Sequence, residues 1–488
     1  MKPLARLSAA DLSNLALEAP DTPMHQAVLA LVEAAPLRGP DGGVLIERLR
    51  EHVASRLERV PQLRQVVHRP GLFRGRPLLV DDPRFRIENH VLLETLPAPG
   101  GEAAALAFAE RQMALRFDRS RPLWAIWVLD GVTRDRLGVL IKLHHAIADG
   151  PAMVNILAQV FDIEPLPPGR CTEAWSPAPP PRGGELVRDN LAQRLATLKL
   201  WIAALAHPGR TFRAGVAAVR ALLEELRQAD GAPRTSFNRP VGAGRRVAAL
   251  HVSLDDAKAI AHGLGVKLND VFLFVAARGL RDALRGRGEN VRGVSLHMSI
   301  AVTRPAVRSA TVSGNHVGTV VVPVPVGIDD AASELRSIAE ATAQAKTMQE
   351  ASLSMELMVL LAETGVARAF TRRQHMLNVL TTNLPGPPVP LYMAGARLES
   401  PVAMPPIAGN VTISFAALSY EAGLCFSLVA DARAWPDLAA VSAGMASGWR
   451  ELQAMLSASI ASEKSDVSTW GSATRLRSAT APMVSDPA

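Results

Sequence analysis

The order of hydrophobic and polar residues changes repeatedly between a period of two and a period of about 3.6, which are typical of strands and helices respectively. Apolar stretches rich in Val, Ile and Leu predict strands at 123–129, 137–143, 247–254, 294–302, 318–326, 378–383, 411–418 and 424–430. Helical spacing predicts helices at 44–60, 104–115, 151–160, 255–262, 268–284 and 332–348. Pro323 and Pro325 place the end of one strand at a sheet edge, because proline cannot donate to the ladder. The mixture predicts an α/β protein.

A proline-rich segment divides this pattern into two parts. Residues 165–182, PLPPGRCTEAWSPAPPPR, favour neither helix nor sheet and indicate a linker. A chain of 488 residues is also too long for one ordinary domain. We therefore predict an N-terminal lobe (1–165), a linker with helices (166–235), a C-terminal lobe (236–462) and a disordered tail (463–488), which is rich in Ser, Thr and Ala without periodicity.

The linker region carries two amphipathic helical patterns between 185 and 228. Their apolar stripes are Val187, Leu191, Leu195, Leu198, Ile202 and Leu205, then Phe212, Val216, Val219, Leu223 and Leu226. Seven Arg or Lys residues stand against two acidic residues between 182 and 220. Such a basic hairpin fits an anionic membrane surface, and it fits equally well a helical pair packed on the body with a solvated basic face.

The composition indicates a folded protein and disfavours several classes. Hydrophobic residues make up 48% of the chain and charged residues 20%, so most of it is globular. Cys171 and Cys425 lie far apart, which argues against a disulfide scaffold or a cysteine zinc site and indicates a reducing, cytoplasmic environment. No secretory signal or long apolar run is present. The net charge of +7 favours anionic partners, but two tyrosines and no Arg-rich stretch interleaved with aromatics make nucleic acid the weaker choice.

Two adjacent histidines end a predicted strand in the stretch GVLIKLHHAIADG (138–150). Neighbouring residues on a strand point to opposite faces, so His144 and His145 cannot both face one pocket. This argues against a two-histidine metal site, and no third ligand lies nearby in the sequence. One histidine should be chemical, since a neutral imidazole with a pKa of about 6.5 is suited to take a proton, and the other structural. On the following turn Asp149 can pair with a cation, and Gly150 permits a tight backbone.

HHAIADG resembles the HHxxxDG motif of the CoA-dependent acyltransferase superfamily, which includes chloramphenicol acetyltransferase, carnitine acyltransferases and the condensation domains of peptide synthetases. Other segments resemble one branch, the bacterial wax ester synthase/diacylglycerol acyltransferase family. They are LSAADLSNLALEAPDTPMHQAVLALVE (7–33), RVPQLRQVV (59–67), VDDPRFRIENHV (80–91), FDRSRPLWAIWVLDG (117–131), LNDVFLFVAARGLRDAL (268–284) and TTNLPGPPVPLYMAG (381–395). Motifs in the family's order over most of the chain make coincidence a poor explanation.

The resemblance implies a two-lobed fold of the chloramphenicol acetyltransferase kind, with mixed sheets and an active-site tunnel between the lobes. It implies transfer of a long-chain acyl group from acyl-CoA, with no cofactor, to a fatty alcohol or a diacylglycerol. His145 would be the general base toward the acceptor hydroxyl, a role worth about 10² to 10⁴ in rate. His144 would give structural support. Asp149 would be structural and would pair with an arginine, for which Arg304 is the candidate.

The resemblance also suggests four residues on the substrate side. Asn269 and Asp270 open the helix predicted at 268–284, where free N–H groups and the positive end of the helix dipole gather. Asn269 would orient substrate or donate to an oxyanion, and Asp270 would cap the first turn, although an ordinary capping pair is an equally good interpretation. Asn383 belongs to a rigid loop near the tunnel. Trp124 is grouped with them, although its PLW element is expected to shape the core beside the catalytic strand.

Three other functions fit parts of the sequence. A condensation-type acyltransferase would use a carrier-protein thioester, but the PMH and PLW elements and the lack of an attached carrier module argue against it. A non-catalytic lipid-binding homologue would have no chemical need for the second histidine. Nucleic-acid binding rests on net charge alone. The sequence does not choose between wax ester and triacylglycerol as product, nor does it define acyl length, the CoA-contacting basic residues, oligomeric state, or attachment to a membrane or lipid inclusion.

Overall fold

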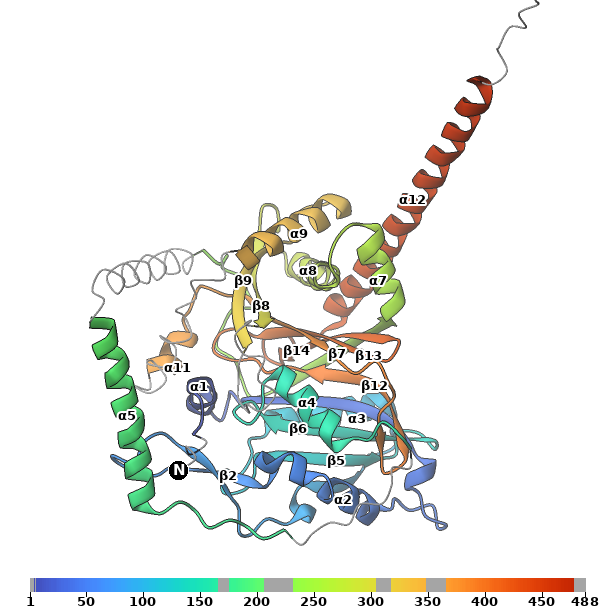
Figure 1. Cartoon of the computed structure of the whole chain (residues 1–488). Helices are drawn as coiled ribbons and strands as arrows, with labels where there is room; N and C mark the ends of the chain where they lie inside the picture. The colour runs from blue at the N-terminus through green and yellow to red at the C-terminus, as the bar shows by residue number, and fades with distance from the viewer. Residues whose placement is uncertain are drawn as a thin grey trace, which may run out of the picture.

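Two six-stranded sheets form the centre of the protein, which the computed structural model describes over residues 4, 6–165, 175–205, 231–303, 317–347 and 366–477. One sheet lies above the other in Figure 1, and a layer of helices covers the upper face of the upper sheet. A smaller two-stranded sheet joins β2 (Gln65–His68) to β3 (Leu78–Asp81). The predicted α/β class is confirmed.

The lower sheet has the strand order β11-β12-β1-β6-β5-β4. Its strands are β1 (His25–Glu33), β4 (Val91–Thr95), β5 (Trp124–Asp130), β6 (Arg136–His144), β11 (Tyr392–Met393) and β12 (Ala396–Met404). In the centre, β1 and β6 run antiparallel with His25 opposite His144. The strands predicted at 123–129 and 137–143 are confirmed as β5 and β6, whereas β1 was not predicted. Its sequence, HQAVLALVE, contains more Ala and Leu than β-branched residues, so its composition does not mark it as a strand.

The upper sheet has the order β7-β14-β13-β10-β8-β9. Its strands are β7 (Arg245–Ser253), β8 (Ser295–Thr303), β9 (Val317–Pro325), β10 (Val379–Pro385), β13 (Ile413–Tyr420) and β14 (Gly423–Asp431). The strand β10 runs parallel to β8 and to β13, and the remaining pairs are antiparallel. All six strands match predicted strands, and β9 lies at the sheet edge as its prolines indicate.

Two strands from the C-terminal half, β12 and the short β11, complete the N-terminal sheet. Although β12 lies between two strands of the upper sheet in the sequence, it pairs antiparallel with β1, from Ala27 opposite Met404 to Val32 opposite Leu398. A hydrophobic cluster then joins the two sheets, with Leu29 and Leu140 below and Val247 and Val429 above. Two strands of the predicted C-terminal lobe, β11 and β12, therefore belong to the sheet of the N-terminal lobe, which the linear division of the chain did not anticipate.

The helix layer packs on the upper sheet (Figure 1). It contains α7 (Leu254–Gly263), α8 (Leu268–Gly286), α9 (Ala331–Thr347) and α12 (Ala439–Arg477). The central helix α8 is buried along most of its length, with Phe272 and Phe274 in the main core. The first three helices confirm the predicted ones at 255–262, 268–284 and 332–348.

Four further helices belong to the lower part of the molecule: α1 (Ala9–Leu17), α2 (Ile46–Ala54), α3 (Gly101–Ala114) and α4 (Gly150–Val160). The helix predicted at 44–60 is wrong in its length. After α2 the chain continues as a separate 3-10 turn at Leu57–Arg59. Because Val60 precedes Pro61, it is disfavoured in the helical region, and the helix ends before it.

The prediction of a disordered tail from residue 463 is also wrong, because α12 continues to Arg477. This segment contains no proline between Pro436 and Pro482 and is rich in Ala and Ser, and alanine in particular favours a helix even without an apolar stripe. Residues 478–488 lie outside the described ranges. Of the predicted helical pair, the first is confirmed as α5 (Gly183–Leu205), and the second lies outside the described residues.

Candidate active site

The two adjacent histidines leave the end of β6 in opposite directions. The side chain of His144 is fully buried, at 0% exposure, whereas His145 is half-buried and lines a cavity of about 430 Å³. The backbone holds both residues, since the N–H of His144 donates to Leu123 O over 2.9 Å and the N–H of His145 donates to Met24 O over 2.8 Å. One histidine therefore reaches the cavity and the other the protein interior.

The cavity lies between the two halves of the chain and is mostly apolar. Its walls come from α1, β1 and α4 on one side, and from β8, β10, β13 and the segment after β12 on the other. The apolar lining includes Met24, Val28, Met153, Val154, Leu157, Leu384, Phe415 and Leu418. A cavity of this kind suits a long hydrocarbon chain.

Two neighbouring cavities extend this space. A narrow one of about 40 Å³ shares Val28, Val154, Leu157 and Leu418 with the main cavity. Another of about 390 Å³ shares Leu398, Pro401 and Tyr420 with the narrow one and also contacts Leu418. The three cavities therefore follow one another between the sheets, with Leu418 on the wall of each.

The ring of His145 is oriented by its own backbone and by α1. Its interaction with its own backbone carbonyl favours the protonated ring, as expected for an Nδ1–H that donates to that oxygen. The Nδ2 amide of Asn14 lies 3.1 Å from Nδ1 and donates to the same carbonyl over 3.4 Å. The Asn14 amide nitrogen can only donate, so this contact favours a lone pair on Nδ1, whereas the backbone carbonyl favours a proton there. In the second of these tautomers the lone pair of the neutral ring is at Nε2. Burial lowers the pKa of His145, while the nearby Asp149 opposes this shift.

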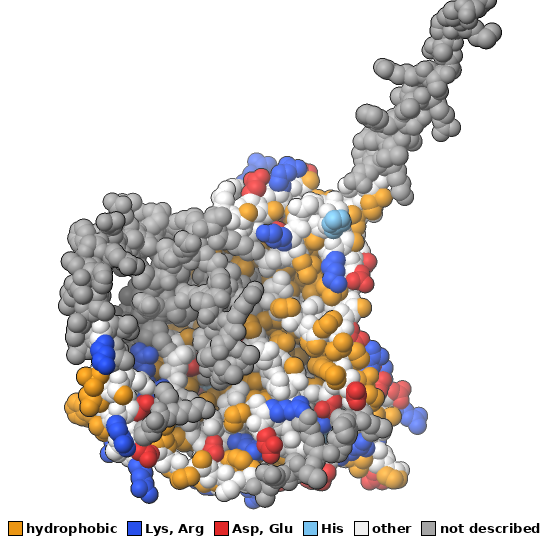
Figure 2. All heavy atoms as spheres, in the orientation of Figure 1, with side chains coloured by type: hydrophobic (Ala, Val, Ile, Leu, Met, Phe, Trp, Pro, Cys, Tyr) orange, Lys and Arg blue, Asp and Glu red, His pale blue; other side chains and the backbone are white. Residues whose placement is uncertain are grey.

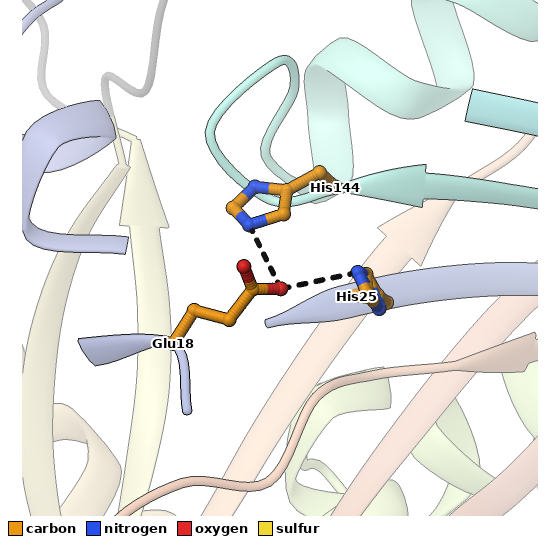
Figure 3. Close-up of side chains that lie close together, drawn as sticks. All are labelled: Glu18, His25 and His144. Carbon is orange, nitrogen blue, oxygen red and sulfur yellow. Dashed lines mark ion pairs between the residues drawn. The ribbon is translucent and has the colours of Figure 1, made fainter. Parts of the chain in front are cut away.

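The ring of His144 belongs to a buried cluster with Glu18 and His25, shown in Figure 3. One carboxylate oxygen of Glu18 lies 3.3 Å from Nε2 of His144 and 3.3 Å from Nε2 of His25. The other carboxylate oxygen accepts from the guanidinium of Arg119 over 2.6 Å. Burial alone would raise the pKa of Glu18, but His144 and Arg119 lower it to about 2, so the group stays a carboxylate.

Glu18, His25 and His144 have the residue types of a metal site, and the first two supply the additional ligands that the sequence did not reveal. The tautomer of His144 argues against this use. The N–H of Ala146 donates to Nδ1 of His144 over 3.0 Å, so the ring proton sits on Nε2, the atom that faces Glu18. A metal would need the lone pair of Nε2 instead. The positive guanidinium of Arg119, which is bound to Glu18, also opposes a bound cation.

The turn after the histidines is held by Asp149 and Gly150. A carboxylate oxygen of Asp149 accepts from the N–H of Ala152 over 2.8 Å, so Asp149 is the N-cap of α4. A Cβ atom added at Gly150 would lie 2.7 Å from a methyl group of Leu384, so glycine lets α4 approach β10 closely. Arg304, the predicted partner of Asp149, lies outside the described residues.

The four predicted substrate-side residues are absent from the described lining of the main cavity. Asn269 and Asp270 lie in the first turn of α8, where Asp270 accepts from the N–H of Lys267 over 2.9 Å and caps the helix. Asn383 lies on β10, between the cavity-lining residues Thr382 and Leu384.

Trp124 is a core residue at 2% exposure. Its indole N–H donates to Leu63 O over 2.7 Å, and its ring stacks on His90 with centroids 4.7 Å apart. The expectation that the PLW element shapes the core fits this position, and a contact of Trp124 with substrate stays a prediction.

Sequence reasoning missed the residues of α1 and the hydroxyl groups that meet at the cavity. Asn14 and Glu18 come from α1 and its C-terminal cap, and Thr382 and Ser299 line the opposite wall. One signal was available, since Ser8 and Asp11 form a reciprocal capping arrangement that marks the start of α1. No local signal connects Thr382 to His145, because the two are far apart in the sequence.

Two family models match this chain. The model of the wax ester synthase/diacylglycerol acyltransferase catalytic domain matches residues 7–272, which is more than half of the chain. The model of the WS/DGAT C-terminal domain matches residues 313–453.

Two similar proteins are named as diacylglycerol O-acyltransferases. A putative diacylglycerol O-acyltransferase of Mycobacterium tuberculosis strain CDC 1551 is 27% identical over 473 residues, covering 92% of this chain and 90% of the relative. A probable diacylglycerol O-acyltransferase of strain H37Rv is 29% identical over 428 residues, covering 85% and 89%.

Solved structures support the fold. The wax ester synthase/diacylglycerol acyltransferase of Marinobacter aquaeolei VT8 superposes with a TM-score of 0.64 at 23% identity, over 93% of this chain and all of that chain. A starter condensation domain of rhizomide synthetase, solved with C8-CoA, superposes with a TM-score of 0.57 at 14% identity, over 93% of this chain and 95% of that domain. The predicted two-lobed fold is confirmed.

Proposed function

Because the chain belongs to the wax ester synthase/diacylglycerol acyltransferase family and is an acyl-CoA-dependent O-acyltransferase, we propose that His145 is the general base for direct transfer of a long acyl chain from CoA to an alcohol in the cavity between the lobes. The observation that carries the proposal is the half-buried His145 ring in the wall of a long, mostly apolar space. The acceptor is a diacylglycerol or a fatty alcohol, and acyl-CoA is a substrate with no further cofactor required.

In the proposed reaction Nε2 of His145 takes the proton of the acceptor hydroxyl as its oxygen attacks the thioester carbonyl. The tetrahedral intermediate then loses the CoA sulfur, which receives the same proton from the imidazolium. A new C–O bond replaces the C–S bond, and no acyl-enzyme forms. Burial raises the pKa of the Cys425 thiol to about 12, so this cysteine is unsuited to act as a nucleophile.

Thr382 is the group we assign to the oxyanion of this intermediate, in place of Asn269. The neighbouring Thr381 uses its hydroxyl to donate to Ser299 O, and its N–H donates to Ser299 Oγ over 3.0 Å. The Thr382 side chain instead faces the main cavity beside Gly150. A hydroxyl in this position can donate to the charge that develops on the thioester oxygen.

The cavities between the sheets support a long-chain substrate. The apolar walls around Val154, Leu157 and Leu418 continue from the space beside His145 into the narrow second cavity. Hydrocarbon binding there needs no polar partner and gains about 0.8 kcal/mol for each buried CH₂ group.

Thiol release tests the proposal directly. Purified protein is mixed with palmitoyl-CoA and either hexadecanol or a diacylglycerol, and free CoA is measured together with the lipid product. CoA release that requires an acceptor supports direct transfer, and the better acceptor identifies the product. Release without an acceptor, or no release with either, contradicts the proposal, and a carrier-protein thioester would then be the donor to examine.

Activity should fall on the acid side of neutrality. The base form of His145 is the neutral ring, and burial lowers its pKa below the ordinary 6.5. We therefore expect kcat/KM to stay level from pH 8 to about pH 6.5 and to fall as the pH drops through the lowered pKa. A pH profile with saturating acceptor measures this, and an inflection above pH 7 would contradict the assigned base.

A lipid surface is the proposed location of the acceptor. The loop between β2 and β3 exposes Leu72 at 86% and Phe73 at 80%, and α5 lies beside it, because Asn190 donates to Phe73 O over 2.8 Å. We call the exposed side chains of this loop and helix the apolar patch: Leu72, Phe73, Val187, Leu191 and Leu195. Exposed Arg69, Arg74, Arg188 and Arg194 belong to the same segments.

Apolar and basic side chains lie together over α5 at the left of Figure 2, an arrangement suited to an anionic lipid surface. Within the described ranges, no single helix is long and apolar enough to cross a bilayer. Among the described helices, one pair, α7 and α8, is long and apolar enough when its two members are taken together, and the chain bends by 101° between them.

The double variant Leu72→Ser/Phe73→Ser should bind vesicles of phosphatidylglycerol and phosphatidylcholine at least tenfold more weakly. Burial of such a side chain is worth about 1.5 to 3 kcal/mol. Vesicle co-sedimentation measures the binding, and Val389→Ser, which alters an exposed apolar residue on another loop, is the control. Equal binding by both variants would remove the apolar patch from the proposal.

A further inference from the structure

We propose that Glu18 is a positioning residue for the catalytic base, acting through His144 on the turn that carries His145. The inference rests on the proposed function, because it gives a role in that reaction to a residue outside the cavity. It concerns geometry, since Glu18 is buried beside the His144 ring and is absent from the described lining of the main cavity.

The first step is the fixed position of the Glu18 carboxylate. Glu18 is 5% exposed and follows the last turn of α1, where its N–H donates to Asn14 O over 3.3 Å. One carboxylate oxygen faces both His144 and His25, and Arg119 holds the other through two N–H groups at 2.6 and 3.1 Å. The backbone carbonyl of Glu18 also accepts from Arg368 over 2.8 Å. The carboxylate is therefore held from several directions.

The second step is the selection of one tautomer of His144. The carboxylate can only accept, so it favours the ring with its proton on Nε2. That tautomer leaves Nδ1 with a lone pair, and this atom accepts from the N–H of Ala146 over 3.0 Å. If the proton moved to Nδ1, it would face the N–H of Ala146, and the hydrogen bond would be lost. Glu18 thus favours the hydrogen bond from the N–H of Ala146 to Nδ1, on the opposite side of the His144 ring.

The third step connects this contact to His145. The N–H of Ala146 belongs to the peptide that directly follows His145, so its direction helps to set the orientation of the His145 backbone. The turn closes when the N–H of Ile147 donates to His144 O over 2.9 Å. On the other side, Asn14 from the same helix contacts Nδ1 and the carbonyl of His145. One helix end therefore holds both histidines, one through Glu18 and the other through Asn14.

A set of four variants tests this role: Glu18→Ala, Glu18→Gln, His144→Ala and the double variant Glu18→Ala/His144→Ala. We expect Glu18→Ala to lower kcat about 10²-fold with little change in KM for acyl-CoA, because small displacements of a catalytic group have effects of this size. Glu18→Gln keeps an acceptor oxygen and should retain most of kcat. The double variant should be no slower than His144→Ala, since Glu18 would act through that ring. Glu47→Ala, which removes an exposed ion pair with Arg50, is the control.

Three outcomes would overturn the inference. A purely structural role would lower the melting temperature of Glu18→Ala while the folded fraction kept the wild-type kcat. Additive effects in the double variant would show that Glu18 does not act through His144. Loss of wild-type activity on chelation, with recovery on adding zinc, would instead indicate a metal at Glu18, His25 and His144.

The reactivity of His145 provides a measurement that does not need turnover. Diethyl pyrocarbonate modifies the imidazole, and peptide mass spectrometry follows the rate at this residue. We expect wild type, Glu18→Gln and Glu47→Ala to react alike, and Glu18→Ala to react several-fold faster because its turn is loosened. If the wild type releases no CoA, the proposed function fails, but the modification rate of His145 still tests the role of Glu18. Equal modification rates in all four proteins would contradict that role.

Discussion

Replacement of His145 by alanine is expected to lower kcat by about 10² to 10⁴ while the protein stays folded. The ring is the proposed proton acceptor in the cavity wall, so removing it takes away the base and leaves the backbone hydrogen bond to Met24 in place. Measurement of CoA release with saturating acyl-CoA and acceptor gives kcat. Thermal unfolding should show a small change in melting temperature, because the side chain is only half-buried.

His262→Ala is the matched control, since this histidine is exposed on α7, a helix absent from the described cavity lining. It should keep the wild-type kcat. If His145→Ala loses less than about tenfold in kcat, the chemical step does not depend on this base. In that case the proton would have to leave through water or another group, and the proposed mechanism would be wrong.

Replacement of Thr382 by valine is expected to lower kcat by about 10² to 10³, the usual effect of losing one oxyanion donor. Valine keeps the shape and the β-branch of threonine, so β10 and its parallel pairing with β13 should be unchanged. The KM for acyl-CoA should change little, because the hydroxyl is proposed to act mainly on the charge of the intermediate.

Thr382→Ser keeps a hydroxyl and should recover most of the activity. The pair of variants separates the donor from the packing of the strand, since serine lacks the methyl group that valine retains. An enzyme in which valine is tolerated and serine is not would assign Thr382 to packing. The oxyanion would then need a different donor.

Much of the fold could be predicted because most of its strands are short apolar segments between clear breaks. All six strands of the upper sheet were predicted. The strand β1 was not predicted because its sequence, HQAVLALVE, contains more Ala and Leu than β-branched residues, and such a composition does not mark a strand. The pairing of β12 with β1 was not predicted for another reason. The two strands lie more than 350 residues apart in the sequence, and no local pattern records their pairing.

The candidate site could also be predicted only in part. The opposite directions of His144 and His145 follow from strand geometry alone, and their different burial agrees with it. The assignment of His145 as the base remains a prediction. Glu18 lies more than 120 residues before His144, so its contact with that ring depends on how α1 packs. The sequence grouped Trp124 with the substrate-side residues, whereas the structure places it in the core. A motif shared within a family can serve the core as well as the substrate.

The pairing of β12 with β1 also has a consequence for folding during synthesis. The strand β1 has β6 on one side, and its other side is completed only by Ala396–Met404, near the end of the chain. During synthesis the N-terminal half would therefore expose the edge of a central, apolar strand until most of the chain has left the ribosome, and such edges are prone to wrong pairing. A gene fragment that ends in the linker would encode His145 beside an open sheet edge.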